Sequence, residues 1–181
     1  MFARTPRLLL RPGFPEDAPA LAHAIGDLAI VRNLSVVPWP YTIRDAEAFL
    51  ASPRDPVLPS FLIVERTDRA PRLIGSCGLG RRPSGAVELG YWIARTSWGR
   101  GFATEAGKAL VDIARTLGLA QLEASHFIDN PASARVLEKL GFESTGIVAP
   151  RMNCARGEEV PARLMRLRLA AAAAKEEALA A

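Results

Sequence analysis

The sequence predicts an α/β protein with a mixed sheet and helices on both of its faces. Segments of strand spacing alternate with segments of helical spacing along most of the chain, and two strand–helix units follow one another after residue 86. In residues 87–93 every second side chain is large and apolar, which is strand periodicity. From Phe102 to Leu117 apolar side chains recur every three or four residues, which is helix periodicity.

The N-terminal third predicts one strand followed by three helical pieces. Residues 12–15 break the strand, and the acids Glu16 and Asp17 then begin a helix at the end where its dipole favours negative charge. Residues 38–40 (Pro-Trp-Pro) force extended backbone, and Thr42 is a suitable N-cap for the next helix. We expect a strand at 7–11 and helices at 16–25, 27–33 and 45–50.

The remainder predicts six strands and two helices. A polar turn at 67–69 between two short apolar runs indicates an antiparallel hairpin. Gly118 and Gly141 mark the ends of the two helices, and Pro131 stands at a favoured early helix position. We expect strands at 60–66, 72–79, 86–94, 121–128, 142–148 and 159–169, and helices at 102–117 and 131–140.

Length and composition indicate one globular domain. The chain has 181 residues, of which 49% are hydrophobic, so it can bury a sizeable core. We expect a domain over residues 1–169 and an alanine-rich tail at 170–181 without an assigned function. No apolar run reaches the ~18–20 residues of a membrane span, and no secretory signal precedes the first strand. We therefore expect a cytoplasmic protein without membrane association.

The charged and sulfur-containing residues exclude several site types. The net charge is +4, and no basic run interleaves with aromatic residues, so nucleic acid is not an expected partner. A polyanionic cofactor would account for the small excess. Cys77 and Cys154 lack metal-ligand spacing and have no histidine near them in sequence, so neither a metal site nor a cysteine nucleophile is expected.

A glycine-bracketed turn between the strand at 86–94 and the helix at 102–117 is the expected ligand site. The first N–H groups of a helix lack internal partners and favour an anion, and small residues allow a phosphate to approach the backbone. Gly99 and Gly101 alternatively serve only to turn the chain. A P-loop lysine is absent, and Thr104 stands where a dinucleotide fingerprint requires its third glycine.

Two segments carry a family resemblance. Residues 98–106 (WGRGFATEA) resemble the acyl-CoA pyrophosphate loop of the GNAT N-acetyltransferases, and residues 130–142 (NPASARVLEKLGF) resemble their second signature. The closest branch is the RimJ/RimL type, whose opening strand is similar to residues 5–12. The resemblance implies the GNAT fold: a mostly antiparallel sheet whose one parallel pair splays at the cofactor site. It also implies acetyl-CoA as cofactor and a primary amine as acceptor.

The resemblance assigns cofactor-binding residues in two groups. The loop group holds the pyrophosphate through backbone N–H groups, with the Arg100 side chain neutralising charge, and backbone N–H near Ile93 and Ala94 would stabilise the oxyanion. Asn130 would contact the pantetheine arm, or else only cap its helix. The implied cofactor-binding residues are Ile93, Ala94, Trp98, Gly99, Arg100, Gly101, Phe102, Ala103, Thr104, Asn130 and Ser133.

Two residues are candidate catalytic groups. Glu88 lies on the strand that leads to the loop and is the candidate general base, since a protonated amine cannot attack. Its alternative is an ion-paired strand glutamate. Ser133 matches the serine of the branch's N-x-x-S form and is the candidate general acid, or else bonds its own helix backbone. The tyrosine that many family members place seven residues after the asparagine is Leu137 here.

The acceptor site is expected on the strand face of Glu88 and Trp92, walled by the first helices with Trp39 and Tyr41. Ordinary packing is the favoured role of the last two aromatic residues. We expect direct acetyl transfer to a protein N-terminal α-amine or a small amine, in a ternary complex without an acyl-enzyme. The rival hypotheses are a non-catalytic acyl-CoA-binding module and a dinucleotide oxidoreductase. Both a monomer and a homodimer are compatible with the sequence.

Overall fold

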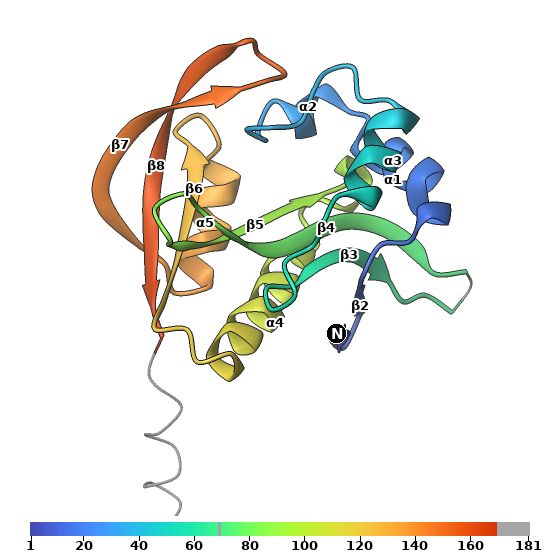
Figure 1. Cartoon of the computed structure of the whole chain (residues 1–181), viewed down its shortest axis with the longest axis horizontal. Coiled ribbons are helices and arrows are strands. Elements are labelled where there is room, and N and C mark those ends of the chain that lie inside the picture. Colours follow the sequence, from blue (N-terminus) through green and yellow to red (C-terminus); the bar gives the residue numbers. More distant parts are fainter. Residues whose placement is uncertain (69, 170–181) are drawn as a thin grey trace, which may run out of the picture.

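A computed structural model describes residues 1–68 and 70–169, so the predicted tail at 170–181 lies outside the described residues. One eight-stranded sheet organises the chain, in the order β1-β2-β3-β4-β5-β6-β8-β7 (Figure 1). The strands are β1 (Ala3–Arg4), β2 (Leu8–Arg11), β3 (Ser60–Glu65), β4 (Arg72–Arg81), β5 (Val87–Ile93), β6 (Gln121–Phe127), β7 (Glu143–Asn153) and β8 (Glu158–Arg168).

The sheet is antiparallel except where β5 meets β6. These two strands are parallel, and their register contains a single residue pair, Glu88 with Glu123. By contrast, β4 and β5 pair over seven positions, from Gly75 with Ile93 to Arg81 with Val87. Beyond Glu88 the strands β5 and β6 therefore diverge, which confirms the mixed sheet and its splayed parallel pair.

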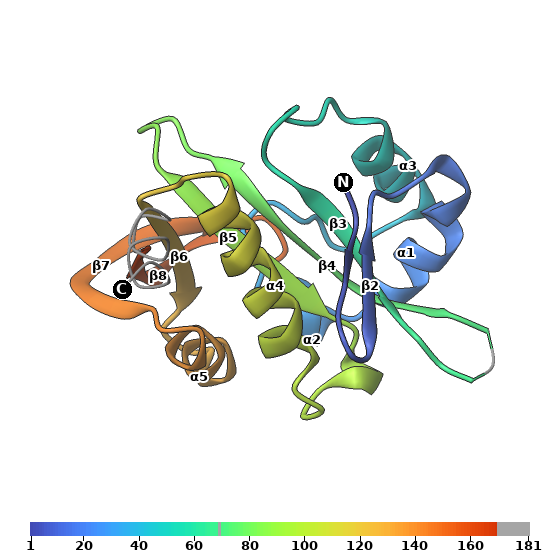
Figure 2. The same ribbon diagram turned by 90° about the horizontal axis from the view of Figure 1, so that it is seen from below.

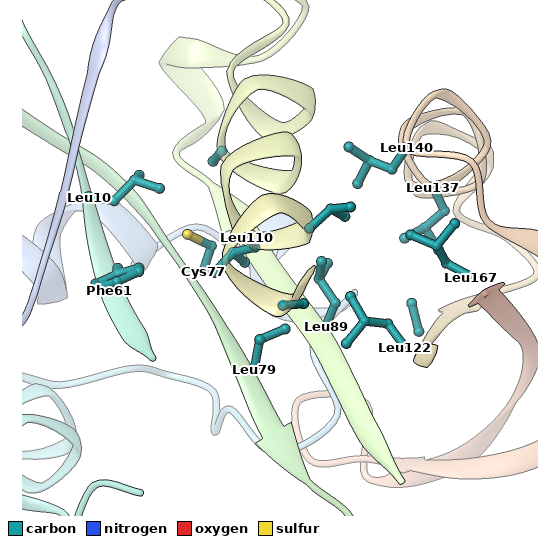
Figure 3. Close-up of a cluster of buried hydrophobic side chains, with 14 of the residues drawn as sticks. Leu10, Phe61, Cys77, Leu79, Leu89, Leu110, Leu122, Leu137, Leu140 and Leu167 are labelled. Atoms are coloured by element: carbon teal, nitrogen blue, oxygen red, sulfur yellow. The ribbon is translucent and has the colours of Figure 1, made fainter. Parts of the chain in front are cut away.

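Helices α4 (Phe102–Thr116) and α5 (Pro131–Lys139) cover one face of the sheet (Figure 2). The hydrophobic core lies between them and the strands. Figure 3 shows Leu110 of α4 and Leu137 of α5 pointing toward the strand residues Leu89 and Leu122. Burial of this apolar surface is the main stabilising term and fixes where the N-termini of both helices lie.

The opposite face carries α1 (Ala18–Ile25), α2 (Leu28–Val31) and α3 (Ile43–Ala51). Leu21, Ala46 and Leu62 join α1, α3 and β3 in one buried cluster. A short 3-10 helix, Pro15–Asp17, leads into α1 and is tied to β2 by two hydrogen bonds from the Arg11 guanidinium to the Asp17 carboxylate, at 2.6 and 2.7 Å.

The predicted elements are confirmed to within two residues at their ends, except for one additional strand and one longer strand. β1 was not predicted, because a two-residue strand leaves no periodicity. The strand predicted at 142–148 extends to Asn153, past Pro150. β7 is the edge of the sheet, where a proline without an N–H need not cost a ladder hydrogen bond. Within residues 1–68 and 70–169, no helix is long and apolar enough to cross a membrane.

Candidate functional site

The opening between β5 and β6 presents backbone groups of β5 to a ligand. The Ala94 N–H donates to the Ile74 carbonyl of β4 at 2.7 Å. Because successive backbone groups of a strand point to opposite sides, the N–H groups of Tyr91 and Ile93 face away from β4, toward the opening. The Ala94 N–H is thus already engaged, and of the predicted oxyanion donors near Ile93 and Ala94 it is the Ile93 N–H that has the required direction.

Trp98 closes part of this edge. Its indole Nε1–H donates to the Ile93 carbonyl at 2.6 Å, so the carbonyl that would otherwise face the opening has a partner. The side chain remains 46% exposed, which leaves its ring accessible to a ligand. Trp98 thus folds back over the end of β5 and shapes the entrance.

The glycine loop has the geometry of an anion site. Gly99 and Gly101 have φ of +73° and +79°, a left-handed backbone that favours glycine. The first intrahelical hydrogen bond of α4 runs from Glu105 N–H to Gly101 O. The N–H groups of residues 102–104 therefore have no partner inside the helix and point out of its N-terminus.

A second feature of this segment also fits a bound group. Ser97 is 1% exposed, and its Oγ is one of two buried side-chain polar atoms without a hydrogen-bond partner among the described residues. Buried hydroxyls are normally hydrogen-bonded. The segment 97–104 therefore combines an unsatisfied hydroxyl with unsatisfied backbone donors, the polar inventory that a diphosphate requires.

The side chain of Arg100 points elsewhere. Its Nη2 donates to the Glu65 carboxylate of β3 at 2.7 Å, and its guanidinium lies over the Phe102 ring, 4.6 Å from the centroid. Burial opposes ionisation of Glu65, yet Arg72 and Arg100 together hold its pKa below the usual value. The guanidinium of Arg100 is thus already ion-paired with Glu65. Within the glycine loop, Arg100 therefore offers a ligand its backbone N–H.

A hydroxyl pair connects β5 to the start of α5. The hydroxyls of Tyr91 and Ser133 lie 2.9 Å apart, although 42 residues separate them in sequence. Burial, opposed by the hydrogen bond with Ser133, raises the pKa of Tyr91 to about 12. Asn130 caps α5, since its Oδ1 accepts the Ser133 N–H at 3.1 Å. Sequence reasoning overlooked Tyr91; its only available signal was a polar atom on an otherwise apolar strand face.

Glu88 lies at the vertex of the opening, where β5 and β6 still pair, and its carboxylate is fully hydrogen-bonded. Its carboxylate accepts hydrogen bonds from Arg82 at 2.7 and 2.9 Å, from Arg151 at 2.9 and 3.0 Å, and from Ser125 Oγ at 2.9 Å. A carboxylate offers about four lone-pair sites. No lone pair is left for an amine proton, so the geometry favours the alternative reading of Glu88, an ion-paired strand glutamate.

The face of β5 that carries Glu88 also carries Trp92. Gly90 lies between them, and neither Gly90 nor Gly80, the partner of Glu88 on β4, has any heavy atom within 4 Å of the position that a Cβ would take. Trp92 packs partly buried against the clusters of α1–α3, beside Tyr41. Burial, with the nearby charge of Asp45, raises the pKa of Tyr41 to about 12. Gly80 and Gly90 therefore leave an open strip on this face of β4 and β5, and Trp92 forms an aromatic wall at one end of it.

The aromatic residues predicted for the acceptor site fall into two groups, one packed against buried clusters and one exposed. Tyr41 and Trp92 meet in the same clusters, as packing predicts. Trp39 is 41% exposed and belongs to neither cluster.

The turn between β7 and β8 is fastened to the loop after α2. Asn153 is fully buried, and its Nδ2 donates to the carbonyls of Arg32 and Leu34 at 2.9 and 3.1 Å. Arg156 bonds the Arg32 carbonyl at 2.9 Å and the Asp129 carboxylate at 2.8 Å. This network joins the β7–β8 turn and the segment after α2 to the residue that precedes Asn130.

Comparison with known proteins agrees with this geometry. The family model described as an acetyltransferase (GNAT) domain matches residues 7–143. The uncharacterized N-acetyltransferase p20 of Bacillus licheniformis is 31% identical over 152 residues, which cover 80% of this chain and 83% of p20. A divergent parallel pair beside a glycine loop therefore belongs here to an acyl-transfer enzyme.

Two solved structures share the architecture. A RimL ribosomal L7/L12 α-N-protein acetyltransferase in complex with coenzyme A has a TM-score of 0.77 at 16% identity, covering 93% of this chain and 98% of that one. The microcin C7 self-immunity acetyltransferase MccE, in complex with acetyl-CoA and AMP, has a TM-score of 0.76 at 16% identity, covering 91% and 94%. The chain belongs to the GNAT acetyltransferase family.

Proposed function

We propose that the chain transfers an acetyl group from acetyl-CoA to the primary amine of a small molecule or a protein N-terminus, directly and in a ternary complex. The observation that carries this is the opening between β5 and β6, with unsatisfied N–H groups at the N-terminus of α4. The similar structures of MccE and RimL contain acetyl-CoA and coenzyme A, respectively.

The residues present fit this cosubstrate. Backbone N–H groups of residues 99–104 would hold the diphosphate, and the Tyr91 and Ile93 N–H groups would face the pantetheine arm and the thioester oxygen. When bound, acetyl-CoA supplies a thioester whose carbonyl carbon an amine attacks and whose thiolate departs. Trp98 and Asn130 remain candidate contacts along the arm.

Proton transfer is assigned to the hydroxyl pair. Tyr91 and Ser133 are both protonated at neutral pH, since the pKa of Tyr91 is about 12, and their hydroxyls share a hydrogen bond. Ser133 would donate a proton to the departing sulfur and take one from Tyr91, which would regain its proton from solvent. The amine would lose its proton to solvent, because the Glu88 carboxylate has no free lone pair.

A covalent enzyme intermediate is not part of the proposal. Cys77 is buried, which raises the pKa of its thiol to about 12, so the nucleophilic thiolate is absent at neutral pH. The resemblance of residues 98–106 and 130–142 to the RimJ/RimL branch, which includes enzymes for N-terminal α-amines and other amines, supports either kind of acceptor.

Two measurements test the proposed function. Acetyl-CoA should raise the melting temperature, whereas NAD should not; stabilisation by NAD alone would contradict the cofactor assignment. Release of free thiol with a panel of amines and N-terminal peptides should then show turnover. Binding of acetyl-CoA without turnover of any amine would instead support the non-catalytic acyl-CoA-binding module.

A further inference from the structure

We infer that the acceptor is a small amine that also carries a carboxylate, and that Arg82 and Arg151 recognise this group. The inference rests on the proposed function and names its substrate class. It begins from the charges at the vertex of the opening, where β5 and β6 still pair.

The vertex holds one positive charge more than it holds negative charges. Arg82 and Arg151 share the single carboxylate of Glu88, and the neighbouring Glu123 is paired with Arg166. Around Glu88 itself, two guanidiniums face one carboxylate, which leaves a local charge of +1. A partly buried charge without a counter-ion is unfavourable, so an anionic ligand group would be stabilised there.

Both guanidiniums keep donors for a ligand. A guanidinium has five N–H donors, and each arginine directs two nitrogens at Glu88. Neither has a buried nitrogen without a partner, and each side chain is 28% exposed. Their remaining N–H groups therefore reach solvent, held in place by Glu88 and ready for the bidentate contact that a carboxylate accepts.

The position of the pair suits the acceptor and not the cofactor diphosphate. Glu88 lies five residues before Ile93, roughly 17 Å along the strand, and the glycine loop follows Ile93. Beside Glu88 lies the open strip over Gly80 and Gly90, with Trp92 at its other end. The Tyr91 N–H also faces the opening and lies three residues, roughly 10 Å along the strand, from Glu88. A small amine lying on this strip would present its carboxylate to the arginines and its nitrogen to a thioester held beside Tyr91.

Matched amines test the inference. γ-Aminobutyrate and n-butylamine differ chiefly in the carboxylate, and an N-terminal peptide with an acidic second residue supplies the charge from a macromolecule. We expect the kcat/KM of wild type to be about 10- to 100-fold higher for γ-aminobutyrate than for butylamine, the range that a hydrogen bond to a charged group supports. Equal values for the two amines, or a preference for the acidic peptide over γ-aminobutyrate, would overturn the inference while leaving the acetyltransferase activity established.

Variants identify the residues. Arg82→Gln and Arg151→Gln should each lower the preference for γ-aminobutyrate at least about tenfold. Arg81→Gln and Arg163→Gln are the matched controls and should retain the preference. Arg81 neighbours Arg82 and bonds only the Gly85 carbonyl among the hydrogen bonds assigned to its side chain, and Arg163 lies on β8 with its side chain on the opposite face. An equal loss in the controls would overturn the assignment.

A binding measurement separates recognition from turnover. Calorimetry on the protein saturated with coenzyme A should detect γ-aminobutyrate binding that weakens with salt in wild type and is lost in Arg151→Gln. Each variant should keep the melting temperature increase caused by coenzyme A, which shows that the fold and the cofactor site are intact. Salt-independent binding, or binding retained in Arg151→Gln, would show that the arginines only brace Glu88.

Discussion

At the scale of single residues, the chemistry of this site depends on which polar atoms already have partners. Glu88 is the clearest case, because its carboxylate accepts hydrogen bonds from Arg82, Arg151 and Ser125. The sequence places a glutamate in a suitable position for a base, yet the two arginines arrive from the β4–β5 turn and from β7, six and 63 residues away. Such long-range partners favour a positioning role for Glu88 over the role of a base.

Glu88→Gln distinguishes the two roles. With a positioning role, the low-pH limb of kcat/KM should follow the pKa of the acceptor amine and be the same in the variant and wild type, while the KM for the acceptor rises. A general base contributes about 10²–10⁴-fold. A loss of that size in kcat at neutral pH, together with disappearance of the limb, would restore Glu88 as the base. The measurement is a pH profile with two amines of different pKa.

Tyr91→Phe tests the proton donor. The change removes only the hydroxyl that bonds Ser133 and leaves the ring packed, so the fold should persist. We expect kcat to fall about 100-fold, at the lower end for a general acid, with little change in the KM for acetyl-CoA. Because the hydroxyls act as a unit, Ser133→Ala and the double variant should each lose about as much as Tyr91→Phe. Additive losses would contradict a shared proton.

At the scale of elements, the N-terminus of α4 is the feature on which cofactor binding depends. The helix is anchored by Phe102 and Leu110 in the core and begins directly after a left-handed glycine. Glu105 in its first turn is held by Thr5 and Arg7: burial opposes its ionisation, but these hydrogen bonds lower its pKa. The N–H groups of the first turn are thereby fixed in direction before a ligand arrives, which reduces the entropy cost of binding.

Gly101→Ala should misalign the backbone N–H groups at the N-terminus of α4. An alanine at φ +79° is strained by about 1–2 kcal/mol, although its Cβ would find room, since the nearest heavy atom would lie 3.6 Å away. Relief of the strain should turn the N–H groups away and weaken coenzyme A binding about tenfold or more, equivalent to about 1.4 kcal/mol. Calorimetry with coenzyme A measures this.

Gly118→Ala is the control at the other end of the helix. Gly118 has φ +71° with open space around the Cβ position, so the strain is similar. It should lower stability by a similar amount and leave the affinity for coenzyme A unchanged. Equal losses of affinity in both variants would show that the loop acts only through stability.

The elements were more predictable than the site, for a physical reason. Periodicity and turn residues are local, so the spacing around Phe102 and the glycines at 99 and 101 were sufficient to predict the loop and α4. The pairing of Tyr91 with Ser133 depends on how α5 lies against β5, which no local pattern contains. The free N–H of Ile93, as against the bonded N–H of Ala94, depends on the register of β4, which is likewise non-local.

At the scale of the whole molecule, one buried asparagine joins segments that lie far apart in the sequence. Asn153 bonds two carbonyls of the segment after α2 and accepts the Arg156 N–H at 2.8 Å. Arg156 in turn holds Asp129: its hydrogen bond lowers the pKa of Asp129, and burial opposes this. Asp129 immediately precedes Asn130 at the start of α5. The β7–β8 turn, the segment after α2 and the helix that presents Ser133 are therefore one connected structure.

Asn153→Ala should separate the β7–β8 turn from the segment after α2. It removes three hydrogen bonds of a fully buried side chain. The Leu34 carbonyl loses its partner, whereas the Arg32 carbonyl keeps Arg156 Nε and the Arg156 N–H keeps the main-chain carbonyl of residue 153, so we expect a loss of about 1–3 kcal/mol in stability. Hydrogen exchange should accelerate in residues 32–36 and 153–157 together, and the KM for the acceptor should rise while coenzyme A binding persists. Asn153→Asp keeps the acceptor for the Arg156 N–H but lacks both donors, so it should release residues 32–36 at least as strongly. Faster exchange confined to 153–157 would mean that the two segments are held independently and that the turn does not position the acceptor.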